Sequence, residues 1–281
     1  MNLTSIDESL LALIQEPAAT DDKYSRGVVG FVTGSAAYPG SALLGVQAAL
    51  KCSIGMVKYV GPERVQDLIL VTSPEVVCFD QSTKAGRANA WVLGSGVPAN
   101  DAEQARNIEL IFYRSGAIAV VDAGSLETLD FSILKAHTLL LTPHAGEMAR
   151  LLNRIEETNK YTAEIVLENA PALAQNLAIT VGQTVLLKGN TSHLASPSGE
   201  VRSIGPNSNH LATAGSGDVL AGILGAIAAA NATAIFDWMD AAELAVRIHS
   251  EAANRAFETS VVTASDIVIQ LQLVVREILA R

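Results

Sequence analysis

The chain has 281 residues, of which 49% are hydrophobic, and it carries a formal net charge of -10 at pH 7. A chain of this size and apolar content can bury one large core, so we expect a single domain over residues 1–281 with a polar lead-in segment over 1–26. The acidic balance and the lack of a long Lys/Arg run argue against a nucleic-acid partner. Any phosphate must then be bound locally, against the overall charge.

The N-terminus and the two cysteines indicate a cytoplasmic protein. The first residues lack the basic and apolar regions of a signal peptide, and the longest apolar run, 219–230, is too short and too rich in glycine and alanine to span a bilayer. Cys52 and Cys78 lie in apolar surroundings without C-x-x-C spacing, as core thiols of a reducing compartment do. No membrane partner is expected.

In chain order, apolar runs typical of buried parallel strands alternate with segments of helical periodicity. Strands are expected at 28–32, 55–60, 76–79, 90–93, 117–122, 138–141 and 184–187. Residues 193–195 and 201–204 flank a Ser-Pro-Ser-Gly turn and predict an antiparallel hairpin. Helices are expected at 10–14, 41–51, 63–70, 101–114, from 148, at 161–178 with a break at Pro171, from 219, at 238–257 and at 265–280. The alternation predicts a three-layer α/β fold with a mostly parallel central sheet.

Such sheets bind ligands at the carboxyl ends of their strands, which places several loops at one site. The loops that follow predicted strands or precede a predicted helix at this edge are 34–40, 94–96, 142–147, 188–192 and 214–218. Together they carry a lysine, a histidine, a glutamate, several hydroxyl groups and many glycines. We expect them to surround one pocket.

The stretch 211–222, Leu-Ala-Thr-Ala-Gly-Ser-Gly-Asp-Val-Leu-Ala-Gly, joins a glycine-rich turn to an apolar helix. Gly215 and Gly217 allow backbone conformations in which successive N–H groups converge, and the first helical turn adds its own N–H groups and dipole. Such a turn suits an anion, phosphate above all. Asp218 is either the N-cap of the helix or a general base that takes a proton from a hydroxyl during group transfer. The stretch alone leaves both alternatives open.

Lys188 and His144 also occupy positions that suggest contact with a ligand. Lys188 follows a buried strand and precedes Gly189, which favours a nucleotide contact over an exposed surface lysine. His144 is a helix cap, a solvent-facing residue or a hydrogen-bonding group for a ligand, and no second His or Cys stands at zinc spacing from it. The other histidines have no supporting pattern and are expected to be structural: His137, His193, His210 and His249.

Three segments resemble the ADP/ATP-dependent NAD(P)H-hydrate dehydratases of the ribokinase-like superfamily. They are Gly34-Ser35 with Tyr38-Pro39-Gly40, residues 141–148 (Leu-Thr-Pro-His-Ala-Gly-Glu-Met) and residues 211–222. With Lys188-Gly189 they cover the chain from about residue 26 to its end. The resemblance implies a ribokinase-like fold and an enzyme that returns the S-form of hydrated NADH or NADPH to the intact cofactor. ADP would become AMP and phosphate, or ATP would become ADP and phosphate, with Mg²⁺ as the metal.

The resemblance also implies which residues form the site. The adenine nucleotide would be bound by Lys188, Gly189, Asn190, Thr191, Ser192, Gly215, Ser216 and Gly217. The hydrated cofactor would meet Ser41, Ala42, Gly96, His144 and Asp218, with Asp218 as the catalytic base. Glu147 stands where related kinases place a glutamate that holds magnesium through water, and the alternative is a first-turn glutamate favoured by the helix dipole.

Other functions and assemblies are open on the sequence. A small-molecule alcohol kinase of the same superfamily, of thiazole or pyrimidine type, would phosphorylate its substrate and stop, and a nucleotide sensor would need no base. Many members of the family carry an epimerase domain ahead of this one. Because residues 1–26 cannot form a domain, we expect a stand-alone dehydratase. Apolar surface on its alanine-rich helices would suit a homo-oligomer such as a tetramer.

Overall fold

The computed structural model describes residues 6–113, 116–130, 135–232 and 236–281. Within these residues, nine strands form one sheet at the centre of the fold. Their order across the sheet is β3-β2-β1-β4-β5-β6-β7-β8-β9. All neighbours from β3 to β7 are parallel, whereas β8 runs antiparallel to β7 and β9. The predicted mostly parallel sheet and its terminal hairpin are therefore confirmed. The strands are β1 (Val28–Val32), β2 (Met56–Val60), β3 (Val77–Phe79), β4 (Ala90–Leu93), β5 (Ile118–Val121), β6 (Thr138–Leu141), β7 (Thr184–Leu187), β8 (Ser192–Ala195) and β9 (Val201–Ile204).

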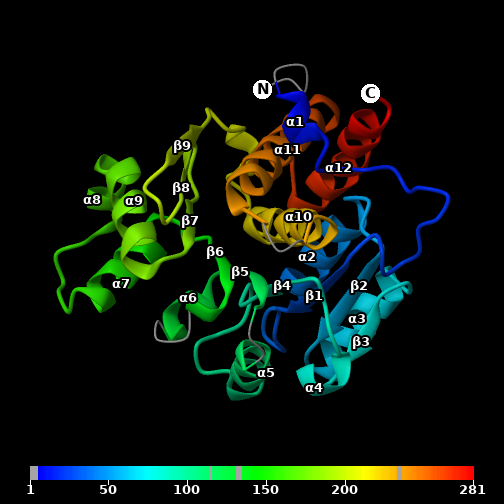
Figure 1. The fold of residues 1–281 in the computed structure, drawn as a ribbon, viewed down its shortest axis with the longest axis horizontal. Helices are drawn as coiled ribbons and strands as arrows, with labels where there is room; N and C mark the ends of the chain where they lie inside the picture. The colour runs from blue at the N-terminus through cyan, green and yellow to red at the C-terminus, as the bar shows by residue number, and fades with distance from the viewer. Residues whose placement is uncertain (1–5, 114–115, 131–134, 233–235) are drawn as a thin grey trace.

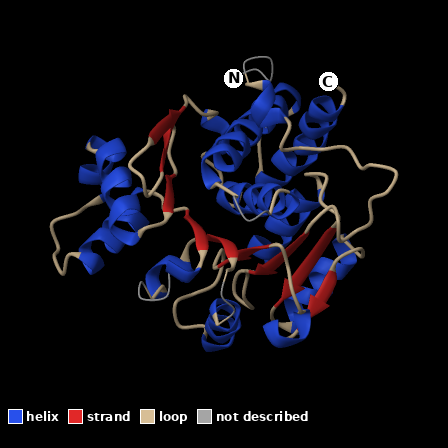
Figure 2. Ribbon diagram, viewed as in Figure 1, coloured by secondary structure: helices blue, strands red, loops and turns tan. Residues whose placement is uncertain are grey.

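Helices cover both faces of this sheet (Figure 1; Figure 2). One face carries α1 (Glu8–Leu11), α2 (Pro39–Leu50), α3 (Glu63–Thr72), α10 (Ser216–Ala230), α11 (Trp238–Thr259) and α12 (Ala264–Leu279). The other carries α4 (Ser82–Ala85), α5 (Ala102–Phe112), α6 (Gly124–Thr128), α7 (Ala145–Ile155), α8 (Ala163–Glu168) and α9 (Ala170–Val181).

Each face of the sheet has its own apolar core. In β4, the Val92 side chain packs with α10, while Trp91 and Leu93 pack on the opposite side. Successive side chains of a strand point to opposite faces, so a strand covered on both sides is apolar throughout. This explains the continuous apolar runs in the sequence and confirms the three-layer fold.

Two prolines determine where helices begin. Pro39 lies in the first turn of α2, which starts two residues before the expected Ser41. Pro171 lies in the first turn of α9, and the expected break in 161–178 falls just before it, at Asn169. Proline lacks the N–H that a first turn leaves unpaired, so it is tolerated there and not in a helix interior. The short helices α4 and α6 were not predicted, because one turn shows no periodicity.

The alanine-rich helix α10 lies between α2 and the sheet, and every residue from Val219 to Ala229 is buried. A Cβ atom at Gly222 would lie 2.1 Å from the carbonyl oxygen of Gly45 in α2. A Cβ at Gly225 would lie 2.3 Å from Val92 in the sheet. The prediction that the alanine-rich helices expose apolar surface is therefore wrong for α10. No helix among the described residues is long and apolar enough to cross a membrane.

We predict that Gly222→Ala lowers the free energy of unfolding by about 2 kcal/mol or more, because α2 and α10 must move apart to admit a methyl group. Denaturant unfolding measures this change. Gly40→Ala is the matched control, since the space beside Gly40 in the first turn of α2 is open. Equal stabilities of the two variants would contradict the close contact between α2 and α10.

Candidate active site

The loops at the carboxyl edge of the sheet are held to one another by backbone hydrogen bonds. Just past β6 and β7, His144 and Lys188 pair as an isolated parallel bridge, and the Lys188 N–H donates to the Pro143 carbonyl at 2.8 Å. Past β1 and β4, the Gly34 N–H donates to the Ser95 carbonyl at 2.7 Å. Four of the five loops predicted to meet are thus linked in pairs.

A buried ion pair lies at the centre of this edge. Lys188 Nζ donates to Asp122 Oδ1 at 2.6 Å, and the two side chains are only 19% and 6% exposed. The hydroxyls of Ser95 and Thr142 also donate to the Asp122 carboxylate, each at 2.8 Å. Burial alone raises the pKa of Asp122, but the Lys188 ammonium and the two hydroxyls outweigh it and hold that pKa below its usual value.

Three carboxylates lie close enough to Lys188 to affect its pKa. Burial lowers the pKa of Lys188, while Asp122, Glu147 and Asp218 raise it, and the net result lies above the usual value. A Cβ at Gly217 would lie 3.8 Å from Lys188 Nζ, which places the ammonium beside the first turn of α10. The alternative of an exposed surface lysine is therefore wrong.

The glycine-rich turn leads into α10 as expected, but the helix begins at Ser216, three residues before the expected start at 219. Gly215 is the N-cap residue, with a φ of 89° that disfavours any residue bearing a Cβ, and Asp218 is the third residue of the helix. The capping alternative for Asp218 is thus wrong. Burial raises the pKa of the Asp218 carboxyl above its usual value, although a hydrogen bond from Ser41 works against the shift.

Of the residues predicted to meet the hydrated cofactor, Ser41, Ala42 and Gly96 lie at or next to the start of α2, where Ser41 contacts Asp218, whereas His144 lines the separate cavity beside Lys188. The Ser41 hydroxyl donates to Asp218 Oδ1. Gly96 faces Ser41 closely, since a Cβ there would lie 2.4 Å from Ser41 Cβ. Ala42 is fully buried and packs closely against Gly34, since a Cβ atom at Gly34 would lie 2.7 Å from Ala42 Cβ. These residues are brought together with the catalytic candidate.

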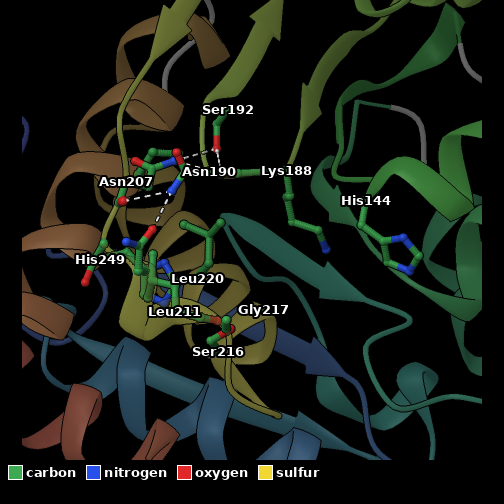
Figure 3. A pocket seen from close by; sticks show the side chains of 15 residues that line it. His144, Lys188, Asn190, Ser192, Asn207, Leu211, Ser216, Gly217, Leu220 and His249 are labelled. Carbon is green, nitrogen blue, oxygen red and sulfur yellow. Dashed lines mark hydrogen bonds between the residues drawn. The ribbon is translucent and has the colours of Figure 1, made fainter. Parts of the chain in front are cut away.

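A cavity of about 480 Å³ opens beside Lys188 and the first turn of α10 (Figure 3). This volume lies within the range of small-molecule sites. Six of the eight predicted nucleotide residues line it, namely Lys188, Gly189, Asn190, Ser192, Ser216 and Gly217, and His144 lines it as well. Thr191 and Gly215 do not line it. Of the two hydroxyls at the end of the lysine loop, Ser192 is the one at the cavity.

His144 and Glu147 form a capping box at the start of α7. The Nδ1 atom of His144 accepts from the N–H groups of Gly146 and Glu147, and Glu147 Oε2 accepts from the His144 N–H at 2.9 Å. Both residues therefore order a helix terminus that borders the cavity. Among the described residues, no three His, Cys, Asp or Glu side chains gather as a metal-binding group.

Sequence reasoning missed several residues of this site. Asp122 follows β5 at the same edge of the sheet, so the rule that selected the other loops applies to it and could have found it. Asn207 and Ser208 line the cavity from the segment between β9 and the 3₁₀ helix η3 (Asn209–Leu211), and Asn209 lines it from the start of η3. His249 lines it from the middle of α11, where no local pattern distinguishes it from a core residue.

Comparison with known proteins identifies the family. The model of the NAD(P)H-hydrate dehydratase family matches residues 29–272. The bifunctional NAD(P)H-hydrate repair enzyme of Mycobacterium tuberculosis is 38% identical over 220 residues, 76% of this chain and 43% of that protein. The ADP-dependent (S)-NAD(P)H-hydrate dehydratase of Neisseria meningitidis is 30% identical over 222 residues, 75% of this chain and 72% of that protein. The chain thus spans less than half the length of the bifunctional relative.

Solved structures show the same fold. The ADP/ATP-dependent NAD(P)H-hydrate dehydratase of Bacillus subtilis, co-crystallised with ATP and Mg²⁺, superposes with a TM-score of 0.83 at 23% identity over 97% of both chains. A ribokinase-like superfamily protein of Enterococcus faecalis gives 0.81 at 19% identity over 97% of this chain and 95% of the other. The predicted ribokinase-like architecture is confirmed. With a family model matched over most of its length, the chain belongs to the NAD(P)H-hydrate dehydratase family.

Proposed function

We propose that this protein dehydrates the S-form of hydrated NADH and NADPH back to NADH and NADPH, converting ADP to AMP and phosphate or ATP to ADP and phosphate. The observation that carries the proposal is the place of Asp218. The Asp218 carboxylate accepts a hydrogen bond from Ser41, and the two residues that precede Asp218, Ser216 and Gly217, line the nucleotide-sized cavity. A base in this place lies between two binding regions. The Neisseria meningitidis relative is named for this reaction.

The proposed chemistry turns a poor leaving group into a good one. The terminal phosphoryl group passes from the nucleotide to the ring hydroxyl of the substrate, while Asp218 takes the hydroxyl proton. The C–O bond then breaks with phosphate as the leaving group, as the lone pair of the ring nitrogen forms a C=N bond. Loss of a proton from the neighbouring ring carbon restores the dihydropyridine. The raised pKa of Asp218 suits a base that works near neutral pH.

The chain supplies two groups for the transferred phosphoryl charge. Lys188 places its ammonium beside the first turn of α10, where helical N–H groups have no partner within the helix. Bound Mg²⁺ would neutralise further phosphate charge. We propose that Glu147 holds it through water, because the Glu147 carboxylate is already engaged by His144. The nucleotide phosphates would supply most other ligands.

We also propose that the protein forms one domain and works in the cytoplasm as a homo-oligomer such as a tetramer. The continuous sheet supports one domain, and the unpaired thiols Cys52 and Cys78 fit a reducing compartment. Exposed apolar side chains at the end of α11, in the connection to α12 and on α12 supply surface for an interface between subunits: Phe257, Val261, Ile269 and Leu273.

The first test of the function is a repair assay. Hydrated NADH and NADPH lack the absorbance of the reduced nicotinamide, so the protein with Mg²⁺ and ADP or ATP should restore that absorbance and release one phosphate per cofactor. Omission of the nucleotide should abolish both signals, because the free hydroxyl leaves poorly. Accumulation of a phosphorylated small alcohol, with the hydrate untouched, would indicate a kinase instead.

We predict that Asp218→Asn lowers the turnover number by about two to four orders of magnitude, since the amide cannot take a proton. Affinity for ADP and the melting temperature should stay close to the wild-type values. Asp237→Asn is the matched control, because Asp237 does cap a helix, α11. Near-normal turnover of the Asp218 variant in the repair assay would show that Asp218 is not the general base.

A third prediction separates the two roles of Lys188. Lys188→Met leaves Asp122 buried without its cation, so the free energy of unfolding should fall by about 3–5 kcal/mol at pH 7. ADP binding should weaken about tenfold to hundredfold, with less effect on the hydrated cofactor. In the Lys188→Met/Asp122→Asn double variant, stability should largely return while ADP affinity stays low. Calorimetric binding and denaturant unfolding measure the two effects, and normal ADP affinity in the double variant would refute the phosphate contact.

A further inference from the structure

The first turns of α2 and α10 meet at the edge of the sheet that carries the site, and one pair of side chains joins them. The hydroxyl of Ser41, the third residue of α2, donates to Oδ1 of Asp218, the third residue of α10. The two backbones also approach here, because a Cβ atom at Gly45 would lie 3.3 Å from the Asp218 carbonyl oxygen. Ser41 and Gly45 are one helical turn apart, so one face of α2 contacts both the side chain and the backbone of Asp218.

Ser41 has little freedom to move away from this carboxylate. A Cβ atom at Gly96, in the loop after β4, would lie 2.4 Å from Ser41 Cβ and 2.7 Å from Ser41 Oγ. The Gly34 N–H donates to the Ser95 carbonyl at 2.7 Å, which ties the loop that leads into α2 to the loop that carries Gly96. Ser41 is therefore packed against Gly96 as well as hydrogen-bonded to Asp218.

The two oxygens of the Asp218 carboxylate have different surroundings. Oδ1 accepts the one proton that a serine hydroxyl can donate, so this proton is not available to a substrate. Oδ2 has no hydrogen-bond partner among the residues that the structure describes, and a Cβ atom at Gly215 would lie 3.9 Å from it. Gly215 is the N-cap of α10, beside the helical N–H groups that suit the transferred phosphoryl group. The free oxygen thus lies next to the turn proposed to hold that group.

We propose that Ser41 is a positioning residue, which holds Asp218 by Oδ1 and leaves Oδ2 as the oxygen that takes the proton of the substrate. In the proposed transfer, the ring hydroxyl forms its O–P bond as the bridging P–O bond of the nucleotide breaks, and the hydroxyl proton passes to Oδ2. An aspartate without this hydrogen bond can rotate and exchange its oxygens, so the base is in place for a smaller share of the time. The proposal rests on the proposed function and adds which oxygen acts and what orients it.

Direct contact with the substrate is the competing role for Ser41, because the family resemblance places this residue at the hydrated cofactor. The two roles differ in their kinetics. A positioning residue acts in the transition state through Asp218, so its loss lowers kcat. Loss of a contact that the substrate makes equally in the ground state and the transition state raises KM and leaves kcat unchanged.

The experiment is the repair assay with the full chain at saturating ADP and Mg²⁺. We expect Ser41→Ala to lower kcat about tenfold and to change the KM for the hydrated cofactor less than about threefold. In the Ser41→Ala/Asp218→Asn double variant, turnover should equal that of Asp218→Asn within about twofold, because Ser41 acts only through the carboxylate. Ser41→Cys keeps a weak donor and should recover part of the lost turnover, and it carries the test if Ser41→Ala fails to fold.

The pH dependence of kcat/KM is a readout that a loss of packing would not change. Burial raises the pKa of Asp218 and the negative charge of Asp122 adds to this rise, whereas the Ser41 hydrogen bond and the Lys188 ammonium lower that pKa. Ser41→Ala removes one of the two lowering interactions, so Asp218 stays protonated up to a higher pH. The acidic limb of the profile should therefore move to higher pH in Ser41→Ala, with Ser41→Cys between this variant and the wild type.

Ser25→Ala is the matched control. The Ser25 hydroxyl also donates to an aspartate, at 3.0 Å to Asp21 Oδ1, but Ser25 precedes β1 and so lies toward the amino edge of the sheet, opposite the site. This variant should leave kcat, KM and the acidic limb at their wild-type values.

Three results would overturn the proposal. An unchanged kcat and acidic limb in both Ser41 variants would show that the hydrogen bond does not orient the base. A raised KM at normal kcat would make Ser41 a substrate contact, and a further loss in the double variant would show that Ser41 acts without Asp218. Each of these leaves the proposed function intact, because the wild type still repairs the hydrate. A wild type that restored no absorbance would refute the proposed function, and this proposal with it.

Discussion

The Lys188–Asp122 ion pair is the constraint on which the site depends. It joins the ends of β5 and β7 across β6, in a place where either charge alone would be costly to bury. The hydroxyls of Ser95 and Thr142 complete the shell of Asp122, and they come from the loops after β4 and β6. Four neighbouring strand ends are therefore ordered around one carboxylate. The ammonium that compensates it also borders the cavity that we propose holds the nucleotide.

The second constraint is the depth at which α10 is buried. The helix approaches α2 at Gly222 and the sheet at Gly225, and this packing brings its first turn to the same edge of the sheet as Lys188. Asp218 is then a half-buried carboxylate beside Ser41 and not an exposed cap. Packing in the helix interior thus determines the chemistry available at its end.

Several residues of the site have a structural role as well as a proposed functional one. His144 and Glu147 cap α7, and Asn207 holds the lysine loop through Gly189 and Ser192. A side chain that is already hydrogen-bonded loses little conformational freedom when a ligand arrives, which preorganises the site. Two side-chain atoms of this wall, His249 Nε2 and Asn207 Oδ1, are buried without a hydrogen-bond partner among the residues that the structure describes.

The sequence by itself determined the order and type of nearly all long elements, because apolar periodicity and the Pro and Gly positions act locally. It also indicated which loops meet, since the carboxyl ends of parallel strands share one edge, and the family motifs pointed to Asp218 and Lys188. Only the tertiary structure decided that Asp122 neutralises Lys188, that Asp218 lies inside the first turn of α10, and that His249 reaches the cavity from α11. These facts depend on contacts between residues far apart in the chain, and local sequence patterns carry no information about which distant side chains pack together.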